Sequence, residues 1–296
     1  MLIRKVLILG ASGMLGHTLF SLFSSREDMD AYATARSMNG LSRWLSQDLL
    51  SRIQPGVDAG QFGTVEDALK RMKPDVVINC IGIIKQLPES HDPLVAIAMN
   101  ALFPHKLAQA CKTIGARLIH ISTDCVFNGK KGNYSESDFA DADDLYGRTK
   151  YLGEVAYPQC ITLRTSIIGH ELKGKYSLID WFLAQEGTVR GYTRAIYTGF
   201  PTVEMARIIA EYVIPRQDLN GLYHVSSEHI SKYDLLCLVA TQYEKKITIE
   251  RYEDFHCDRS LDSSRFRTAV SYTPPAWPEL VAAMHNSHRA FIKEIA

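Results

Sequence analysis

The sequence lacks the features that mark nucleic-acid-binding, membrane-spanning and metal-binding proteins. Its 33 Lys and Arg residues are balanced by 33 Asp and Glu, and no basic run is present, so a polyanionic partner is not expected. No stretch is apolar for long enough to span a bilayer. None of the six cysteines forms a Cys-x-x-Cys pair, and no spacing of His, Asp and Glu supports a metal site. We therefore expect no nucleic acid, no membrane and no metal as partners.

The cysteines and the N-terminal segment indicate a cytoplasmic protein. Several cysteines lie in apolar runs such as "VVINCIGII", where a reduced, buried thiol is expected. The opening "MLIRKVLILG" has a basic pair and a short apolar run, but no cleavage site follows it. A buried strand is therefore expected there, in place of a signal peptide.

Short apolar runs alternate with helical patterns through the first half of the chain. We expect strands at 3–9, 30–35, 56–59, 75–82, 116–123 and 161–168. Between them we expect helices at 13–25, 40–53, 64–73 and 94–114 and one around Tyr146. Near-continuous apolar strands that alternate with helices are typical of a parallel sheet covered on both faces. The predicted fold class is α/β, with a Rossmann-type doubly wound parallel sheet.

A glycine-rich turn joins the first expected strand to the first helix. Gly10, Gly13 and Gly16 in "LILGASGMLGHTLF" have the spacing G-x-x-G-x-x-G. Glycines at these places permit a tight turn, let the backbone approach a pyrophosphate and allow close helix–sheet packing, while the helix N-terminus attracts phosphate. A purely structural turn is the alternative. The expected dinucleotide contacts in this turn are Gly10, Ser12, Gly13, Met14, Leu15 and Gly16.

The residues about twenty positions later indicate which dinucleotide binds. "YATARSM" carries Arg36 and Ser37 and no acid, which favours a ribose 2'-phosphate and hence NADPH, with NADH as the second option. A solvated surface arginine is the alternative for Arg36. Asp58, at the end of the expected third strand, is assigned to the adenine amino group. Further cofactor contacts are expected at Cys80, Ile81, Gly82 and Asn100.

The alternation loosens after about residue 166. Helical patterns occur at 174–187, 201–215 and 232–245, with a strand pattern at 221–227. We expect an NAD(P)-binding Rossmann domain at residues 1–165 and a smaller C-terminal, mainly substrate-binding domain at 166–296. Some elements of the second part are expected to return to the first.

Tyr146 and Lys150 lie four residues apart in "DDLYGRTKYLGE", so both side chains share one face of a helix. With 14 Tyr in 296 residues, about one such pair is expected by chance, and the pair alone is weak support. Thr123, however, ends the preceding expected strand, at the sheet edge where ligands bind. A hydroxyl, a phenol and an ammonium therefore converge beside the expected cofactor.

These three groups fit the reduction of a carbonyl. Lys150 is expected to lower the pKa of the Tyr146 phenol from about 10 and to bond the nicotinamide ribose. Tyr146 would give a proton to the carbonyl oxygen as hydride arrives. Thr123 would hold that oxygen.

The motifs together resemble an extended short-chain dehydrogenase/reductase. More closely, "STDCVFNGKKGNYSESD", "GFPTVEMARIIA", "GLYHVSS" and "DRSLDSSRF" resemble the dTDP-4-dehydrorhamnose reductase family, over nearly the whole chain. The resemblance implies an enzyme, a sugar-nucleotide 4-ketoreductase of bacterial surface-polysaccharide biosynthesis. Its substrate would be a nucleotide-linked 6-deoxyhexose held by the second domain. The substrate-binding residues that it implies are Cys125, Ile167, Gly199, Pro201 and Thr202.

Two positions depart from that family's pattern. Cys125 stands where the family has an aromatic residue, and Ile167 stands where it has Trp. Both are expected to face the sugar. A UDP- or GDP-linked amino or deoxy sugar therefore remains as open as the dTDP-linked one, and a homodimer remains open as the assembly.

Three other functions are weighed against that of a reductase. A 4,6-dehydratase would need an acid after Asp124, where this chain has Cys125. An epimerase-reductase resembling GDP-fucose synthase would use that Cys with a His, for which His170 is the nearest candidate. A non-catalytic regulatory subunit, like that of methionine adenosyltransferase, would bind NADP and a partner protein.

Overall fold

The computed structural model describes residues 3–295, and its central element is a seven-stranded sheet in the order β10-β6-β5-β4-β1-β2-β3. All neighbouring strands in it are parallel. The strands are β1 (Arg4–Leu9), β2 (Met29–Thr34), β3 (Ile53–Gln54), β4 (Val76–Asn79), β5 (Arg117–Thr123), β6 (Cys160–Thr165) and β10 (Gly221–His224). The predicted α/β fold class is confirmed.

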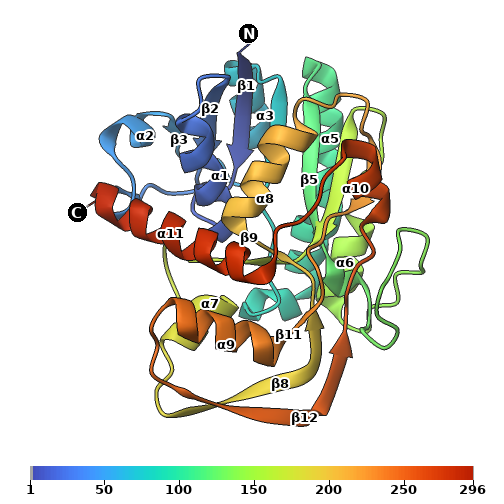
Figure 1. Cartoon of the computed structure of the whole chain (residues 1–296). Coiled ribbons are helices and arrows are strands. Elements are labelled where there is room, and N and C mark those ends of the chain that lie inside the picture. The colour runs from blue at the N-terminus through green and yellow to red at the C-terminus, as the bar shows by residue number, and fades with distance from the viewer. Residues whose placement is uncertain (1–2, 296) are drawn as a thin grey trace.

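Helices cover both faces of this sheet (Figure 1). On one face lie α1 (Met14–Ser24), α2 (Gln47–Ser51), α8 (Thr202–Ile208), α10 (Ser264–Val270) and α11 (Trp277–Ile295). On the other lie α3 (Phe62–Met72) and α5 (Phe103–Ile114), and α6 (Leu145–Leu152) packs beside the helix that leads into α5. Strand β1 shows why: Val6 and Ile8 enter the first core and Leu7 and Leu9 the second, because successive side chains point to opposite faces.

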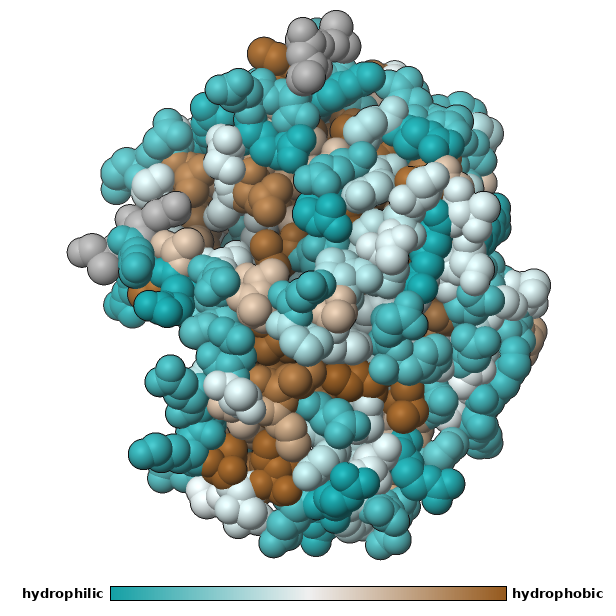
Figure 2. All heavy atoms as spheres, in the orientation of Figure 1, coloured by the Kyte–Doolittle hydropathy of each residue, from teal (hydrophilic) through white to brown (hydrophobic). Residues whose placement is uncertain are grey.

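A smaller sheet lies beyond the carboxyl ends of the large sheet's strands (Figure 1). It has the order β11-β8-β12, α9 packs on all three of its strands, and α7 precedes it in the chain. These elements are β8 (Thr188–Tyr197), β11 (Ile230–Ser231), β12 (Thr248–Asp258), α7 (Leu178–Leu183) and α9 (Lys232–Gln242). One hydrophobic core runs through both parts, since it contains both Val6 and Leu235. Figure 2 shows apolar side chains gathered in the hollow beneath α11, beside α7 and α9.

The chain crosses between the two parts more than once after residue 166. A two-stranded sheet pairs β7 (Ile167–Ile168) with β9 (Phe200–Pro201), and α8 then packs on α1. Strand β10 follows and extends the large sheet beside β6. Within residues 3–295, every helix is too short or too polar to cross a membrane.

Two expected elements near residue 50 differ from the prediction. The helix expected at 40–53 is instead a 3-10 turn η1 (Leu41–Arg43) and the short α2, because the Ser46 side chain caps a new helix by accepting from the Leu49 N–H. The third strand is Ile53–Gln54 and not 56–59. Gly56, in a left-handed conformation with φ +74°, ends the extended segment before residue 57.

The expected helix at 94–114 is helical throughout but changes its pitch. It consists of α4 (Pro93–Ala96), a π-helical segment η3 (Ile97–Leu102) and α5, after a 3-10 turn η2 (Pro88–His91). Pro104 has no N–H to donate to the Asn100 carbonyl, and a π-helical segment accommodates this gap. Two further segments depart from α-helical pitch. One is the 3-10 turn η4 (Asp124–Val126), and the other is the π-helical η5 (Ile209–Val213), which continues α8.

Candidate functional site

The glycine-rich turn has a geometry that only glycines permit. Gly10 has φ +93°, in the left-handed region. A Cβ on Gly16 would lie 2.0 Å from the Gly10 carbonyl oxygen, so α1 can pack this closely only without a side chain there. Gly13 precedes α1 without a side-chain cap, and the first turn has no acid, which leaves its N–H groups and the positive end of the helix dipole for an anion. Ser12 is exposed, Met14 is half-buried and Leu15 is buried.

The residues expected at the adenosine end lie past the second and third strands. Arg36 and Ser37 are exposed directly after β2. Asp58 lies in a turn beyond β3, where its Oδ1 accepts from the Gly60 N–H at 2.9 Å. Its placement at the end of the third strand was wrong because that strand ends at Gln54. The other carboxylate oxygen remains the one to consider for an adenine contact.

The segment after β4 is held against η3 by Asn100. Its side chain accepts from the Ile83 N–H at 2.9 Å and donates to the Ile83 carbonyl at 3.1 Å. A Cβ on Gly82 would lie 3.3 Å from Asn100 Oδ1 and 3.9 Å from Lys150 Nζ. Cys80 and Ile81, just before Gly82, are half-buried. The structure thus brings the expected cofactor segment 80–82 together with Lys150.

Thr123 and Lys150 are both fixed at the carboxyl end of β5. Thr123 ends the strand, and its Oγ1 accepts from the Cys125 N–H and donates to Asp124 Oδ1, each at 3.1 Å. Lys150 donates from Nζ to the Ile121 carbonyl at 2.8 Å. Burial lowers the pKa of Lys150 to about 8, and the carboxylate of Glu154 opposes this shift. At pH 7 Lys150 is therefore mostly protonated, and it loses its charge about one pH unit higher.

The Tyr146 phenol has a raised pKa. Burial raises it above its ordinary value of 10, with Cys125 and Asp124 adding to the shift and a hydrogen bond with Thr123 opposing it. The expected lowering by Lys150 is wrong for this arrangement, because the ammonium is bonded to a main-chain carbonyl and burial dominates. The phenol is consequently a proton donor at neutral pH.

Helix α6 reaches this position because glycines line it. Asp144 caps the helix by accepting from the Gly147 N–H at 2.7 Å. A Cβ on Gly147 would lie 2.2 Å from the Cys125 carbonyl oxygen. A Cβ on Gly153 would lie 1.9 Å from the main-chain carbonyl oxygen of Asn100. Both contacts draw α6 toward the ends of β5 and η3, which sets where Tyr146 and Lys150 stand.

Gly199 and Cys125 lie near the buried Tyr197, and Ile167 is on the strand that pairs with the residue after Gly199. Ile167 pairs with Phe200, and a Cβ on Gly199 would lie 2.2 Å from the Tyr197 hydroxyl. Burial raises the pKa of Tyr197, and Asp124 and Cys125 add to the rise. The Tyr197 side chain is therefore close to Cys125 as well as to Gly199.

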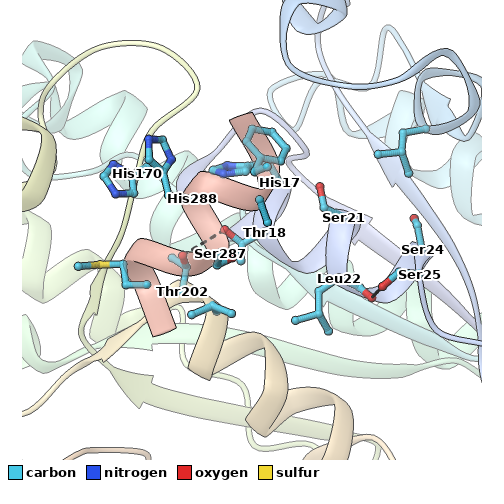
Figure 3. A pocket seen from close by; sticks show the side chains of 15 residues that line it. His17, Thr18, Ser21, Leu22, Ser24, Ser25, His170, Thr202, Ser287 and His288 are labelled. Carbon is cyan, nitrogen blue, oxygen red and sulfur yellow. Dashed lines mark hydrogen bonds between the residues drawn. The ribbon is translucent and has the colours of Figure 1, made fainter. Parts of the chain in front are cut away.

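Thr202 faces a different part of the molecule. It accepts a hydrogen bond from the Thr18 hydroxyl at 3.1 Å and lines a pocket of about 340 Å³ between α1 and α11 (Figure 3). Pro201, just before it, pairs with Ile168. The structure therefore does not bring Thr202 to the cluster that contains Cys125.

Cys125 and His170 do not form the pair that an epimerase-reductase needs. His170 contacts Asp180 through Nδ1 at 2.6 Å and the Tyr243 hydroxyl through Nε2 at 2.8 Å, so both ring nitrogens are engaged. Burial also raises the pKa of the Cys125 thiol to about 12, which keeps it protonated. This weakens the epimerase-reductase alternative.

Two basic side chains reach the site from the C-terminal part and were missed by sequence reasoning. Arg259 donates from Nε to the Phe127 carbonyl at 2.8 Å, and its Nη1 lies 3.8 Å from Cys125 Sγ. Burial raises the pKa of Asp124, and the positive charges of Arg259 and Lys232 oppose that rise. The segment "DRSLDSSRF" contained the signal for Arg259, but no spacing connected it to Cys125.

A histidine cluster lines the pocket of Figure 3 and predicts how stability depends on pH. His17 contacts the Gly13 carbonyl through Nδ1, and burial lowers its pKa to about 4. Between pH 6.5 and 4 the unfolded chain therefore binds more protons than the folded one, and stability falls as the pH falls. His17 contributes at most roughly 3 kcal/mol to this loss. The free energy of unfolding, measured by chemical denaturation between pH 6.5 and 4, should fall less steeply with falling pH for His17→Gln than for the native chain.

The exposed His256 on β12 provides the control. His256→Gln should leave the slope between pH 6.5 and 4 unchanged. An equal slope for His17→Gln and the native chain would mean that the buried His17 is not a source of acid sensitivity.

The fold and the arrangement at its carboxyl edge define an extended short-chain dehydrogenase/reductase. A glycine-rich turn follows β1, and Thr123, Tyr146 and Lys150 lie at the end of the parallel sheet. Within this superfamily the chain belongs to the RmlD substrate binding domain family, whose model matches residues 4–288. The predicted resemblance is confirmed.

Named relatives fall into two groups. A dTDP-4-dehydrorhamnose reductase of Mycobacterium tuberculosis H37Rv is 32% identical over 172 residues, which cover 55% of this chain and 50% of that protein. The match thus spans about half the length of that reductase. Methionine adenosyltransferase 2 subunit beta of Danio rerio is 29% identical over 258 residues, which cover 81% of this chain and 74% of that protein.

Solved structures share the fold. A dTDP-4-dehydrorhamnose reductase from Bacillus anthracis, solved in complex with NADP, has a TM-score of 0.77 and 19% identity, and the match covers 96% of this chain and 99% of that one. One from Sulfolobus tokodaii, described as hypothetical, has a TM-score of 0.74 and 25% identity over 92% and 98% of the two chains. At 19% identity the first likeness shows the fold alone.

Proposed function

We propose that the chain is an NADPH-dependent reductase of the 4-keto group of a nucleotide-linked 6-deoxyhexose. The observation that carries this is the convergence of Thr123, Tyr146 and Lys150 at the carboxyl end of β5, next to segment 80–82. The family membership and the relatives named as dTDP-4-dehydrorhamnose reductases support the same reaction.

The residues present fit a dinucleotide. The uncapped N-terminus of α1 offers N–H groups to a pyrophosphate, and the contact between Gly16 and Gly10 leaves that approach free of side chains. When bound, NADPH would supply the hydride. Similar folds have been solved with NADP and, in a Bordetella bronchiseptica enzyme, with NAD, so they support a nicotinamide dinucleotide, and the choice of NADPH rests on Arg36.

The chain's own residues then handle the substrate's oxygen and its proton. The raised pKa of Tyr146 keeps the phenol protonated, so it can donate to the carbonyl oxygen as negative charge develops there. The Thr123 hydroxyl, which donates to Asp124 in this structure, would turn its O–H to that oxygen as a second donor. Lys150 presents its ammonium toward Gly82, where it would bond a ribose hydroxyl.

The C-terminal part supplies positive charge on the substrate side. We assign the cofactor mainly to residues 1–165 and the sugar nucleotide mainly to 166–296. Arg259 and Lys232 are placed to meet a diphosphate, and their action on Asp124 supports that assignment. Cys125 and Ile167 would contact the sugar itself, and both are smaller than the aromatic residues of the related family.

The test is a panel of 4-keto-6-deoxy sugars linked to dTDP, UDP and GDP, followed by the loss of NADPH absorbance. Turnover of at least one member, with one NADPH consumed for each sugar reduced, is the expected result. Tight NADPH binding without turnover of any member would oppose the proposal.

Arg36 is expected to select NADPH over NADH. Its exposed guanidinium follows β2, where it can pair with a 2'-phosphate. Arg36→Ala should weaken NADPH binding by about ten- to a hundredfold, as a charged hydrogen bond of 1.5–3 kcal/mol implies, and leave NADH binding nearly unchanged. Fluorescence titration with each cofactor measures this. Unchanged NADPH affinity with weaker NADH binding would assign Arg36 a different role.

A non-catalytic regulatory subunit is the second candidate. The methionine adenosyltransferase subunit beta of Danio rerio matches 81% of this chain, more than the 55% matched by the mycobacterial reductase. In that case the chain would bind NADP and a methionine adenosyltransferase catalytic subunit. Size-exclusion chromatography of the two proteins with NADP, together with the turnover panel above, separates the candidates.

A further inference from the structure

Glu154 is held at the end of α6 by an unusually complete set of donors. The Ser122 hydroxyl and Arg164 Nε both donate to Oε1 at 2.7 Å, and Arg164 Nη2 donates to Oε2 at 2.7 Å. The Arg164 side chain is only 3% exposed and that of Glu154 only 10%. A two-pronged bond to a buried guanidinium fixes both the position and the orientation of a carboxylate.

The large sheet supplies the frame for this carboxylate. Ser122, Arg164 and His224 are direct neighbours across β5, β6 and β10. His224 Nε2 lies 3.2 Å from Arg164 Nη1, and its Nδ1 contacts the Tyr134 carbonyl at 3.0 Å. A neutral His224 can accept from the guanidinium and donate to that carbonyl. The Arg164 charge is thereby held in line with Glu154.

The same strand also positions Lys150. Its ammonium donates to the carbonyl of Ile121, and the next residue, Ser122, donates to Glu154. Lys150 and Glu154 are four residues apart in the sequence. Consecutive residues of β5 therefore anchor a cation and an anion near each other, without a direct ion pair between Lys150 and Glu154 in the described chain.

We propose that Glu154 is a positioning residue that keeps Lys150 charged and directed at the cofactor side of the site. The importance of this for reduction rests on the proposed function, whereas the coupling between the two side chains does not. Glu154 contacts neither substrate nor cofactor in this assignment and acts through Lys150.

The charges around Lys150 support this coupling. Burial lowers the pKa of Lys150 to about 8, and Glu154 is the first group that opposes the shift, followed by Cys80 on the segment after β4. His120 on β5 is a further titratable neighbour, and Tyr146 lies four residues earlier on α6; both are neutral at pH 7 because burial disfavours their charged forms. The other charged group of the network is Arg164, which is paired with Glu154. Within the described residues, the other group that opposes the fall in the Lys150 pKa is Cys80, and burial keeps its thiol protonated and therefore uncharged.

The direct test is the titration of Lys150 by NMR with carbon-13 at the lysine ε position, assigned with Lys150→Met. In Glu154→Gln the Lys150 pKa should fall by about one unit or more below the native value. Glu154→Asp should recover part of the shift, and Glu253→Gln, an exposed change on β12, should cause none. An unmoved Lys150 pKa in folded Glu154→Gln overturns the inference.

Glu154→Gln leaves a buried guanidinium without its carboxylate, so a second variant guards against loss of the fold. Glu154→Gln combined with Arg164→Gln removes both charges and keeps side chains that can hydrogen-bond. The Lys150 pKa should again fall, but by less than in Glu154→Gln, because the positive charge of Arg164 is lost together with the carboxylate. A value that is unchanged or raised in this variant overturns the inference too. NADPH affinity followed from pH 6 to 9 is the second readout, and its decline should begin about one pH unit lower in either variant than in the native chain. A fall in the Lys150 pKa without any NADPH binding would support the coupling and oppose the proposed function.

Discussion

Tyr146→Phe should lower the single-turnover rate of hydride transfer by about a hundred- to ten-thousand-fold, the usual contribution of a general acid. NADPH affinity should stay nearly unchanged, because the ring and its packing remain and the phosphates are bound at the turn from Gly10 to Gly16. The measurement is rapid mixing of the NADPH complex with a 4-keto sugar nucleotide that the panel has identified. Single turnover isolates the chemical step from product release.

Lys150→Met separates the two roles proposed for the catalytic group. It should slow hydride transfer and also weaken NADPH binding, because the ammonium is assigned to the ribose. The double variant with Tyr146→Phe should be much less impaired than the product of the two single effects, since residues that act as a unit are not additive. Near-native single turnover in Tyr146→Phe would reject the reductase mechanism and favour the regulatory-subunit candidate.

Gly16→Ala should cost about ten- to a hundredfold in NADPH affinity and should also destabilise the fold. The added methyl would lie 2.0 Å from the Gly10 carbonyl oxygen, and this neighbour is backbone, so α1 itself must move. Overpacking of this kind costs about 1–3 kcal/mol, and 1.4 kcal/mol corresponds to tenfold in affinity. Fluorescence titration with NADPH and urea denaturation measure the two effects.

Gly63→Ala is the matched control, because it makes the same change in a helix on the other face of the large sheet. A Cβ at Gly63, in α3, would meet nothing within 4 Å. The change should leave NADPH affinity as it is and be neutral or stabilise by up to about 1 kcal/mol, because alanine favours helices over glycine. Native NADPH affinity in Gly16→Ala would mean that the close packing of α1 does not position the phosphate site.

The elements predicted well are those whose pattern is local. Strands β1, β4 and β5 are continuous apolar runs, and their pairing in a parallel sheet follows from the helices between them. Strands β8 and β12 were missed because β12, "TIERYEDFHCD", is mostly exposed and has no apolar alternation. It is extended because it pairs with β8, a partner about sixty residues earlier. No local pattern carries that information.

The site residues can likewise be separated into those that a local sequence pattern reveals and those that only tertiary contacts bring together. The spacing of Gly10, Gly13 and Gly16 and the helical offset of Tyr146 and Lys150 are local, and the sequence by itself determined which residues could form a dinucleotide turn and a proton-donating pair. Only the tertiary structure decided the direction of the Tyr146 pKa shift, because burial depends on what the rest of the chain places around a phenol.

Tertiary structure alone also assembled the charged groups. Arg259 reaches Cys125 from 134 positions along the chain, and Arg164 meets Glu154 only because β6 lies beside β5 in the sheet. The bond between Thr18 and Thr202 arises in the same way, since α8 packs on α1. Sequence spacing determines neighbours within one helix or strand, whereas contacts between elements depend on the order of the strands and the packing of the layers.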